Sequence, residues 1–169
     1  GTYYISNVTT TGGTSNFNNT STASAGGYGN YTSTYTVAQT VGGSVSVSIA
    51  WPSGTYGASV FVDWNQNGSF ADAGEKMFGT TSYVSAPYSS SFTVPATAIN
   101  GITRMRVVAD YLSGAPIDCP TNTSAETEDY AFVVSGGLTS TPCPNKIWNL
   151  SANVTGGGIP YTYSWSSSP

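Results

Sequence analysis

The sequence contains no histidine among its 169 residues. This absence excludes Ser-His-Asp and Cys-His catalysis, in which an imidazole moves the proton. It also excludes a structural zinc site, because two cysteines alone cannot supply four ligands. No phosphate-binding loop ending in Gly-Lys-Ser or Gly-Lys-Thr is present. These absences exclude particular kinds of catalysis and of metal and phosphate binding, not catalysis in general.

Charged side chains are scarce, at 7% of the chain with a net charge of −4. The four basic residues are too few to neutralise a run of phosphates, so we expect no nucleic-acid partner. No apolar run approaches the length of a transmembrane helix, so we expect no membrane insertion. No signal peptide precedes Gly1, so for an exported protein we expect this to be a mature or excised piece. All eight acids lie between Asp63 and Asp129, which makes the middle of the chain an anionic zone that could attract cations.

Cysteine occurs only twice, as Cys119 and Cys143, each beside a proline. One interpretation is two unrelated thiols. The other is a single disulfide, because an even number of cysteines in a chain rich in Tyr, Thr and Asn is typical of exported proteins. We predict the Cys119–Cys143 disulfide and an extracellular location.

Short segments in which apolar and polar residues alternate make up most of the sequence, and no segment has a convincing helical period. Residues 45–51 are the clearest case, with Val45, Val47, Ile49 and Trp51 on one face. Two further segments place Tyr31, Ser33, Tyr35 and Val37, and Met105, Val107, Ala109 and Tyr111, on one face each. The pattern predicts an all-β protein, an antiparallel β-sandwich of jelly-roll-like type with a C-terminal β tail.

Composition also suggests where the chain divides. Residues 1–135 are predicted to form the β-sandwich domain, and residues 136–142, rich in Gly, Ser and Thr, a linker. Residues 143–169 contain two strand-like segments, which cannot fold alone. We expect them to be a partial second β-domain or a tail that donates strands to a neighbouring copy.

The most specific pattern lies in residues 63–75. Asp63, Asn65 and Asn67 recur at every second position, Gly68 follows, and Ser69 can offer its backbone carbonyl. Oxygen ligands at positions 1, 3, 5 and 7 with glycine at position 6 are typical of the first half of an EF-hand Ca²⁺ loop. The sequence therefore predicts a Ca²⁺-stabilised turn between two strands. The alternative is an ordinary turn, since Asn and Gly are frequent in turns without any metal.

The second half of this loop departs from the EF-hand pattern, because position 12 is Gly74. The closing acid would be Asp72 or Glu75, and both remain candidate ligands.

A second acidic cluster lies near the end of the domain. Glu126 and Glu128 share one face of a predicted strand, and Asp129 points to the other. Two acids on one face repel each other unless a cation lies between them, and the candidates are Ca²⁺, Arg104 or Arg106. We interpret the three acids as additional metal ligands or structural acids. A catalytic carboxylate pair is conceivable, but nothing in the sequence shows two carboxyl groups facing each other across a cleft.

Four ordered motifs resemble the GEVED domain, a family named after its terminal Gly-Glu-x-Glu-Asp motif. They are Val62-Asp63-Trp64-Asn65-Gln66-Asn67-Gly68, Gly74-Glu75-Lys76, Thr103-Arg104-Met105-Arg106-Val107 and Glu126-Thr127-Glu128-Asp129-Tyr130. The resemblance covers about residues 3–135 and departs at Ala125, where the family name has glycine. Residues 154–166 are similar to the first part of repeat domains in gliding-motility adhesins.

The resemblance implies a non-catalytic extracellular module of a large secreted protein on the surface of gliding bacteria that use type IX secretion. Its function would be structural or adhesive, in an adhesin or surface filament. Its partners would be other domains or copies of the same protein, or cell-surface glycans and proteins.

The alternative function is a carbohydrate-binding accessory module of a secreted enzyme. Four tyrosines in polar surroundings, Tyr28, Tyr56, Tyr83 and Tyr88, suit the flat face of a sugar or a protein partner. The alternative, which we favour, is that they are residues at the edges of strands, without a ligand.

Overall fold

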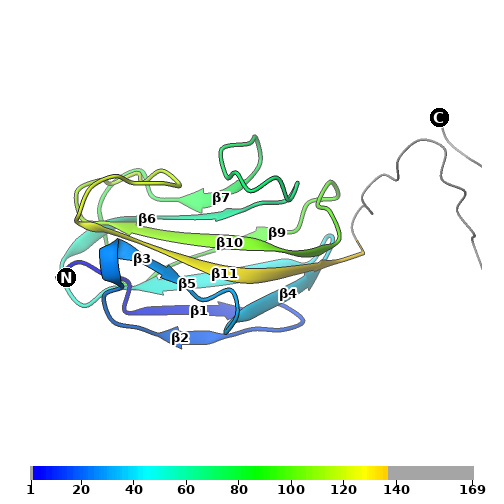
Figure 1. Cartoon of the computed structure of the whole chain (residues 1–169), viewed down its shortest axis with the longest axis horizontal. Helices are drawn as coiled ribbons and strands as arrows, with labels where there is room; N and C mark the ends of the chain where they lie inside the picture. The colour runs from blue at the N-terminus through cyan, green and yellow to red at the C-terminus, as the bar shows by residue number, and fades with distance from the viewer. Residues whose placement is uncertain (1, 137–169) are drawn as a thin grey trace, which may run out of the picture.

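The computed structural model describes residues 2–136, which fold as two β-sheets packed face to face (Figure 1). The first sheet has four strands in the order β2-β1-β5-β9, with every pair antiparallel. Its strands are β1 (Asn7–Thr11), β2 (Asn18–Thr20), β5 (Ser44–Ala50) and β9 (Tyr88–Thr93). The prediction of a β-sandwich is confirmed.

The second sheet has seven strands and runs in the order β3-β11-β10-β6-β7, with β4 also paired to β11 and β8 to β6. Its strands are β3 (Tyr28–Asn30), β4 (Thr36–Thr40), β6 (Thr55–Val62), β7 (Lys76–Gly79), β8 (Val84–Ser85), β10 (Gly101–Asp110) and β11 (Ala125–Ser135). A single turn of 3₁₀ helix, η1 (Ala25–Gly27), precedes β3. The acidic motif lies at the start of β11, between β3 and β10.

One edge of the second sheet differs from the antiparallel prediction, because β3 and β4 both pair with β11 in parallel. The two short strands lie one after the other along the same long strand. Between them the chain makes only a turn, in which the amides of Thr34 and Tyr35 donate to the carbonyl of Tyr31. The chain therefore keeps its direction, and residues 31–35 are a turn rather than the start of the predicted strand.

The alternating pattern located the core correctly in β5 and β10. Val45, Val47 and Ile49 are fully buried, and the inward residues Met105 and Val107 are too. These side chains fill the space between the sheets, where burial of apolar area provides most of the stabilisation. Tyr111 was also predicted to point inward but is 38% exposed, because β10 ends at Asp110.

Strand β6 is buried on both faces, which alternation does not reveal. Val60 and Val62 point into the main core. Phe61 points to the outer face of the sheet, where it forms a small second cluster with Val108 and Phe70. Phe70 belongs to the loop that follows β6, so this loop folds back over the sheet and covers it.

No helix between residues 2 and 136 is both long and apolar enough to cross a membrane. The predicted linker, apart from residue 136, and the predicted tail at 143–169 lie outside the described residues.

Candidate functional site: the Asp63 loop and the acids of β11

The loop of residues 63–75, called the Asp63 loop below, joins β6 to β7. The carboxylate of Asp63 holds its first turn together by accepting hydrogen bonds from two backbone amides further along the loop. The Asp63 side chain is 3% exposed. One of its carboxylate oxygens accepts a hydrogen bond from the amide of Asn67 at 3.1 Å, and the other from the amide of Gly68 at 2.9 Å. Gly68 adopts a φ of 87°, a conformation that glycine reaches without the strain of a Cβ. The predicted tight reversal at Gly68 is present.

The two asparagines turn toward the same acid. The side-chain amide nitrogens of Asn65 and Asn67 lie 3.1 and 2.7 Å from one carboxylate oxygen of Asp72. The hydrogen bond from Asn67, and to a smaller extent the one from Asn65, lowers the pKa of Asp72. The carbonyl oxygens of the same side chains accept backbone amides two residues further on, those of Asn67 and Ser69. Five of the predicted ligand residues are thus drawn into one hydrogen-bonded loop.

Glu75 reaches into this loop from its last position. One of its carboxylate oxygens accepts the amide of Asn65 at 3.3 Å. The other, Oε2, is buried and has no hydrogen-bond partner, and the residue is only 2% exposed. Burial, with further contributions from Asp63 and Asp72, raises the pKa of Glu75. An unpaired buried carboxylate oxygen is costly, and it marks the position where the loop lacks a positive partner.

Three contacts fasten the Asp63 loop to the second sheet. The Thr103 hydroxyl donates to the backbone carbonyl of Asp63 at 2.5 Å, and the Arg104 guanidinium donates to the carbonyl of Gly68 at 3.1 Å. The ring of Phe70 lies under the Arg106 guanidinium, whose central carbon is 4.6 Å from the ring centroid. The Thr-Arg-Met-Arg motif on β10 is therefore the support of the loop.

Asp129 completes this network from β11. Its two carboxylate oxygens accept hydrogen bonds of 2.7 and 2.8 Å from Arg106, a two-point pairing that fixes the plane of the guanidinium. Tyr28 donates a third hydrogen bond at 2.9 Å, and Arg104 lies 3.6 Å away. Asp129 is fully buried, and its hydrogen bonding to Arg106 raises the pKa of that guanidinium. The chain of contacts runs from Asp129 through Arg106 and Phe70 to the Asp63 loop.

Glu126 and Glu128 lie on the opposite, inner face of β11, as the alternation predicts. Glu126 accepts the backbone amides of Ile5 and Ser24, both at 2.6 Å. Glu128 accepts the hydroxyl of Ser21 at 2.9 Å and that of Tyr130 at 2.5 Å. No guanidinium contacts either acid among the described residues, so the expected arginine partner belongs to Asp129 alone.

Glu126 and Glu128 do not contact the Asp63 loop, and Asp129 is connected to it only through Arg106 and Phe70. The amide of Asp63 donates to the carbonyl of Arg104 on β10. In the register of β10 with β11, Arg104 lies opposite Ala131, whereas Glu126 lies opposite Ala109. Five residues of strand, roughly 17 Å, separate these two positions along β11. Glu126 and Glu128 instead hold the N-terminal segment against the sheet. No sequence pattern predicts this partner, because Ile5 and Ser24 contribute backbone amides.

The remaining predicted site residues lie apart. Cys119 is exposed, and its predicted partner Cys143 is outside the described residues, so the disulfide stays a prediction. Of the tyrosines expected in polar surroundings, Tyr28 and Tyr83 are 44% and 50% exposed. Tyr56 is a correction: it is 2% exposed and stacks on Trp51, because it lies on the inner face of β6 in the main core, with Val60 and Val62.

Glu128 should make stability depend on pH. Burial raises its pKa to about 7, above the value of about 4.5 expected in the unfolded chain. The folded state then binds the proton more tightly, so this contribution to stability is complete below about pH 4.5 and is lost as the pH rises through about 7. Glu128→Gln should abolish that loss. Thermal unfolding of both proteins between pH 5 and 8 should show the variant gaining on the wild type as the pH rises; a constant difference would contradict this assignment.

Comparison with known proteins places this arrangement in a family. A family model described as the GEVED domain matches residues 57–133, from β6 to β11. This segment, which contains the Asp63 loop, both arginines and all three acids of β11, belongs to the GEVED domain family, and the resemblance seen in the sequence is confirmed. GEVED domains are typically found in extracellular proteins. No curated protein matches the chain.

Proposed function

We propose that the chain is a non-catalytic structural and adhesion module of a large secreted bacterial surface protein or surface filament, and that Ca²⁺ stabilises it. Membership of an extracellular family supports a location outside the cell. A surface with few charges and many hydroxyl and amide groups suits a module that keeps its shape there. Gliding motility and type IX secretion are the setting that the sequence resemblance suggests.

The observation that carries the Ca²⁺ proposal is the unpaired carboxylate oxygen of Glu75. It lies in a loop whose other acids, Asp63 and Asp72, already accept hydrogen bonds. No three His, Cys, Asp or Glu side chains of residues 2–136 form a cluster that could hold a metal. Amide and backbone oxygens would have to complete the site, as they do in Ca²⁺ loops.

The residues that would hold the ion are those of the predicted loop: Asp63, Asn65, Asn67, Ser69 through its carbonyl, Asp72 and Glu75. All supply oxygen, which is the ligand that Ca²⁺ prefers. The ion would supply the positive charge that Glu75 lacks and would draw the two asparagine amides round toward it. Extracellular sites of this kind need only affinities of about 10⁻⁴–10⁻³ M.

Terbium luminescence tests this proposal, because Tb³⁺ takes the same oxygen ligands and is excited by a nearby tryptophan, here Trp64. We expect saturable emission that Ca²⁺ displaces and that Glu75→Gln loses. The matched control is Asp118→Asn, which removes a carboxylate outside the loop and should leave emission unchanged. Emission that does not saturate, or that survives Glu75→Gln, would overturn the Ca²⁺ site.

The absence of catalysis is supported by the environment of the two glutamates on β11. All four carboxylate oxygens accept hydrogen bonds from the protein, and both residues are at most 1% exposed. A glycosidase pair needs both groups beside the substrate. The second candidate function is a carbohydrate-binding accessory module, and a cavity beside Tyr3 favours it.

A further inference from the structure

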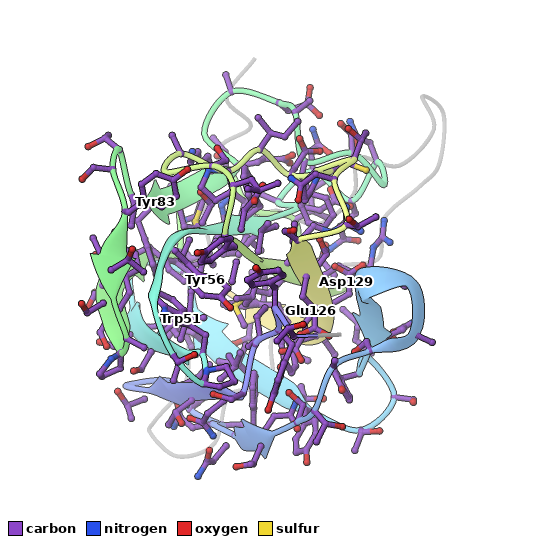
Figure 2. All side chains as sticks on the ribbon, turned by 90° about the vertical axis from the view of Figure 1, so that its left-hand side faces the viewer. Trp51, Tyr56, Tyr83, Glu126 and Asp129 are labelled. Atoms are coloured by element: carbon purple, nitrogen blue, oxygen red, sulfur yellow. The ribbon has the colours of Figure 1, made fainter. Side chains whose placement is uncertain are left out.

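A cavity of about 480 Å³ opens at the end of the sandwich where β10 ends and β11 begins. Tyr3 forms one wall, the turn η1 with Gly26 and Gly27 a second, and residues 120–123 a third. Figure 2 views the molecule from this end and shows Glu126 near its centre. The volume falls within the range of about 300–1,000 Å³ of small-molecule sites.

Tyr3 provides a rigid aromatic surface in this cavity. Its ring stacks on Tyr111 with centroids 4.3 Å apart, and Tyr56 meets it edge-on at 6.3 Å. The side chain is nevertheless 36% exposed. A tyrosine that is backed by two other rings and still open to a cavity offers flat apolar area at little cost in conformational entropy.

Hydrogen bonds within the protein hold the walls of the cavity in place without a ligand. Asp110 accepts the side-chain amide of Asn122 at 2.8 Å and the backbone amide of Leu112 at 2.7 Å, which fixes the wall of residues 120–123. On the other side, Glu126 accepts the amides of Ile5 and Ser24 and so holds the segments that carry Tyr3 and η1. A preformed site loses little free energy to ordering when it binds.

The chemistry of the lining is polar and almost uncharged. Ser24, Thr121 and Thr123 contribute hydroxyl groups, whereas the side-chain amide of Asn122 already donates to Asp110 and accepts the backbone amide of Ser124. Within the described chain, Glu126 is the one charged residue of the lining, and both of its carboxylate oxygens already accept backbone amides. The site therefore suits a neutral molecule that combines hydroxyl groups with an apolar face.

We propose that this cavity binds a neutral sugar residue of a glycan, stacked on Tyr3 and hydrogen-bonded by the hydroxyl groups around it. Glu126 acts as a positioning residue that holds two of the walls. The proposal does not depend on Ca²⁺, because the Asp63 loop adjoins the opposite end of β10, beside Arg104 rather than Asp110.

The test is a titration of the whole chain with neutral hexasaccharides of glucose, mannose, galactose and N-acetylglucosamine, followed by calorimetry. We expect saturable binding of at least one, weakened about tenfold or more by Tyr3→Ala. Thr121→Trp, which places a bulky ring at the rim of the cavity and leaves Tyr3 in place, should also weaken binding. Tyr83→Ala is the matched control, since it removes an exposed tyrosine outside the lining and should keep full affinity.

Two outcomes would overturn the sugar site. One is no saturable binding of any of the four hexasaccharides by a folded wild type. The other is binding that both Tyr3→Ala and Thr121→Trp retain. Thr121 is exposed at the rim, so the second variant keeps the test valid if Tyr3→Ala loosens the N-terminal segment. Neither outcome bears on Ca²⁺ binding by the Asp63 loop.

Discussion

Replacing Arg106 with alanine is expected to lower the free energy of unfolding by about 3–5 kcal/mol, the range measured when one partner of a buried ion pair is removed. Asp129 is fully buried and takes two hydrogen bonds from Arg106. Tyr28 would then be the one side chain left at hydrogen-bonding distance from this carboxylate among the described residues. The guanidinium of Arg104 lies further away, at 3.6 Å. The variant also uncovers Phe70, on which the guanidinium lies. Urea unfolding measures the loss directly.

The matched control is Arg104→Ala. Arg104 carries the same charge on the same strand, but its side chain is 39% exposed and lies 3.6 Å from Asp129. Exposed pairs contribute about 0–1 kcal/mol, so this variant should lose far less. Equal losses in the two variants would mean that Asp129 is stabilised by positive charge in general and not by the two-point contact with Arg106.

Replacing Glu126 with alanine is expected to cost about 3 kcal/mol or more, because hydrogen bonds to charged groups contribute about 1.5–3 kcal/mol each. The change leaves the amides of Ile5 and Ser24 without their acceptor. Glu126→Gln keeps one carbonyl oxygen and should lose roughly half as much. Hydrogen exchange of these two amides, alongside urea unfolding, separates loss of the N-terminal segment from general loosening.

Asp118→Ala controls for the removal of one negative charge, since Asp118 uses its backbone carbonyl, not its carboxylate, to bind Arg106. It should change stability by less than about 0.5 kcal/mol. If Glu126→Ala leaves exchange at Ile5 and Ser24 unchanged, these hydrogen bonds do not hold the segment and the walls of the cavity are fixed by other contacts.

Alternation along single strands was sufficient to predict much of this structure. It placed Val45, Val47 and Ile49 in the core, and it put Asp129 on the face opposite Glu126 and Glu128. These predictions succeeded because side chains of a strand alternate strictly between two faces. The tight turn at Gly68 was predictable for a similar local reason, since few other residues adopt its φ.

Contacts between distant segments were not predictable from the same patterns. Nothing in the sequence distinguishes Ile5 and Ser24 as partners of Glu126, because the groups involved are backbone amides that every such residue has. The burial of Tyr56 was missed because its cover comes from Trp51 and Tyr3 on other segments. The role of Phe70 depends on how the Asp63 loop folds back, which alternation along β6 does not specify.

The structure shows how the four motifs that resemble the GEVED domain contact one another in this chain. The Asp63 loop, the arginines of β10 and Asp129 of β11 form one continuous set of contacts on the outer face of the second sheet. Glu126 and Glu128 on the inner face hold the N-terminal segment instead. The acidic motif of β11 therefore has two separate structural tasks, one on each face of its strand.

Thermal unfolding in excess Ca²⁺ and in excess chelator, for the wild type and Glu75→Gln, is the most direct test of the proposed Ca²⁺-stabilised module. A ligand at about 100 times its dissociation constant stabilises the fold by roughly 2.7 kcal/mol, which raises Tm by several degrees. We expect that rise in the wild type alone. In chelator, Glu75→Gln should melt at or above the wild type, because glutamine removes an unpaired buried charge. Equal Tm values for the wild type in both buffers would show that the Asp63 loop is only a turn.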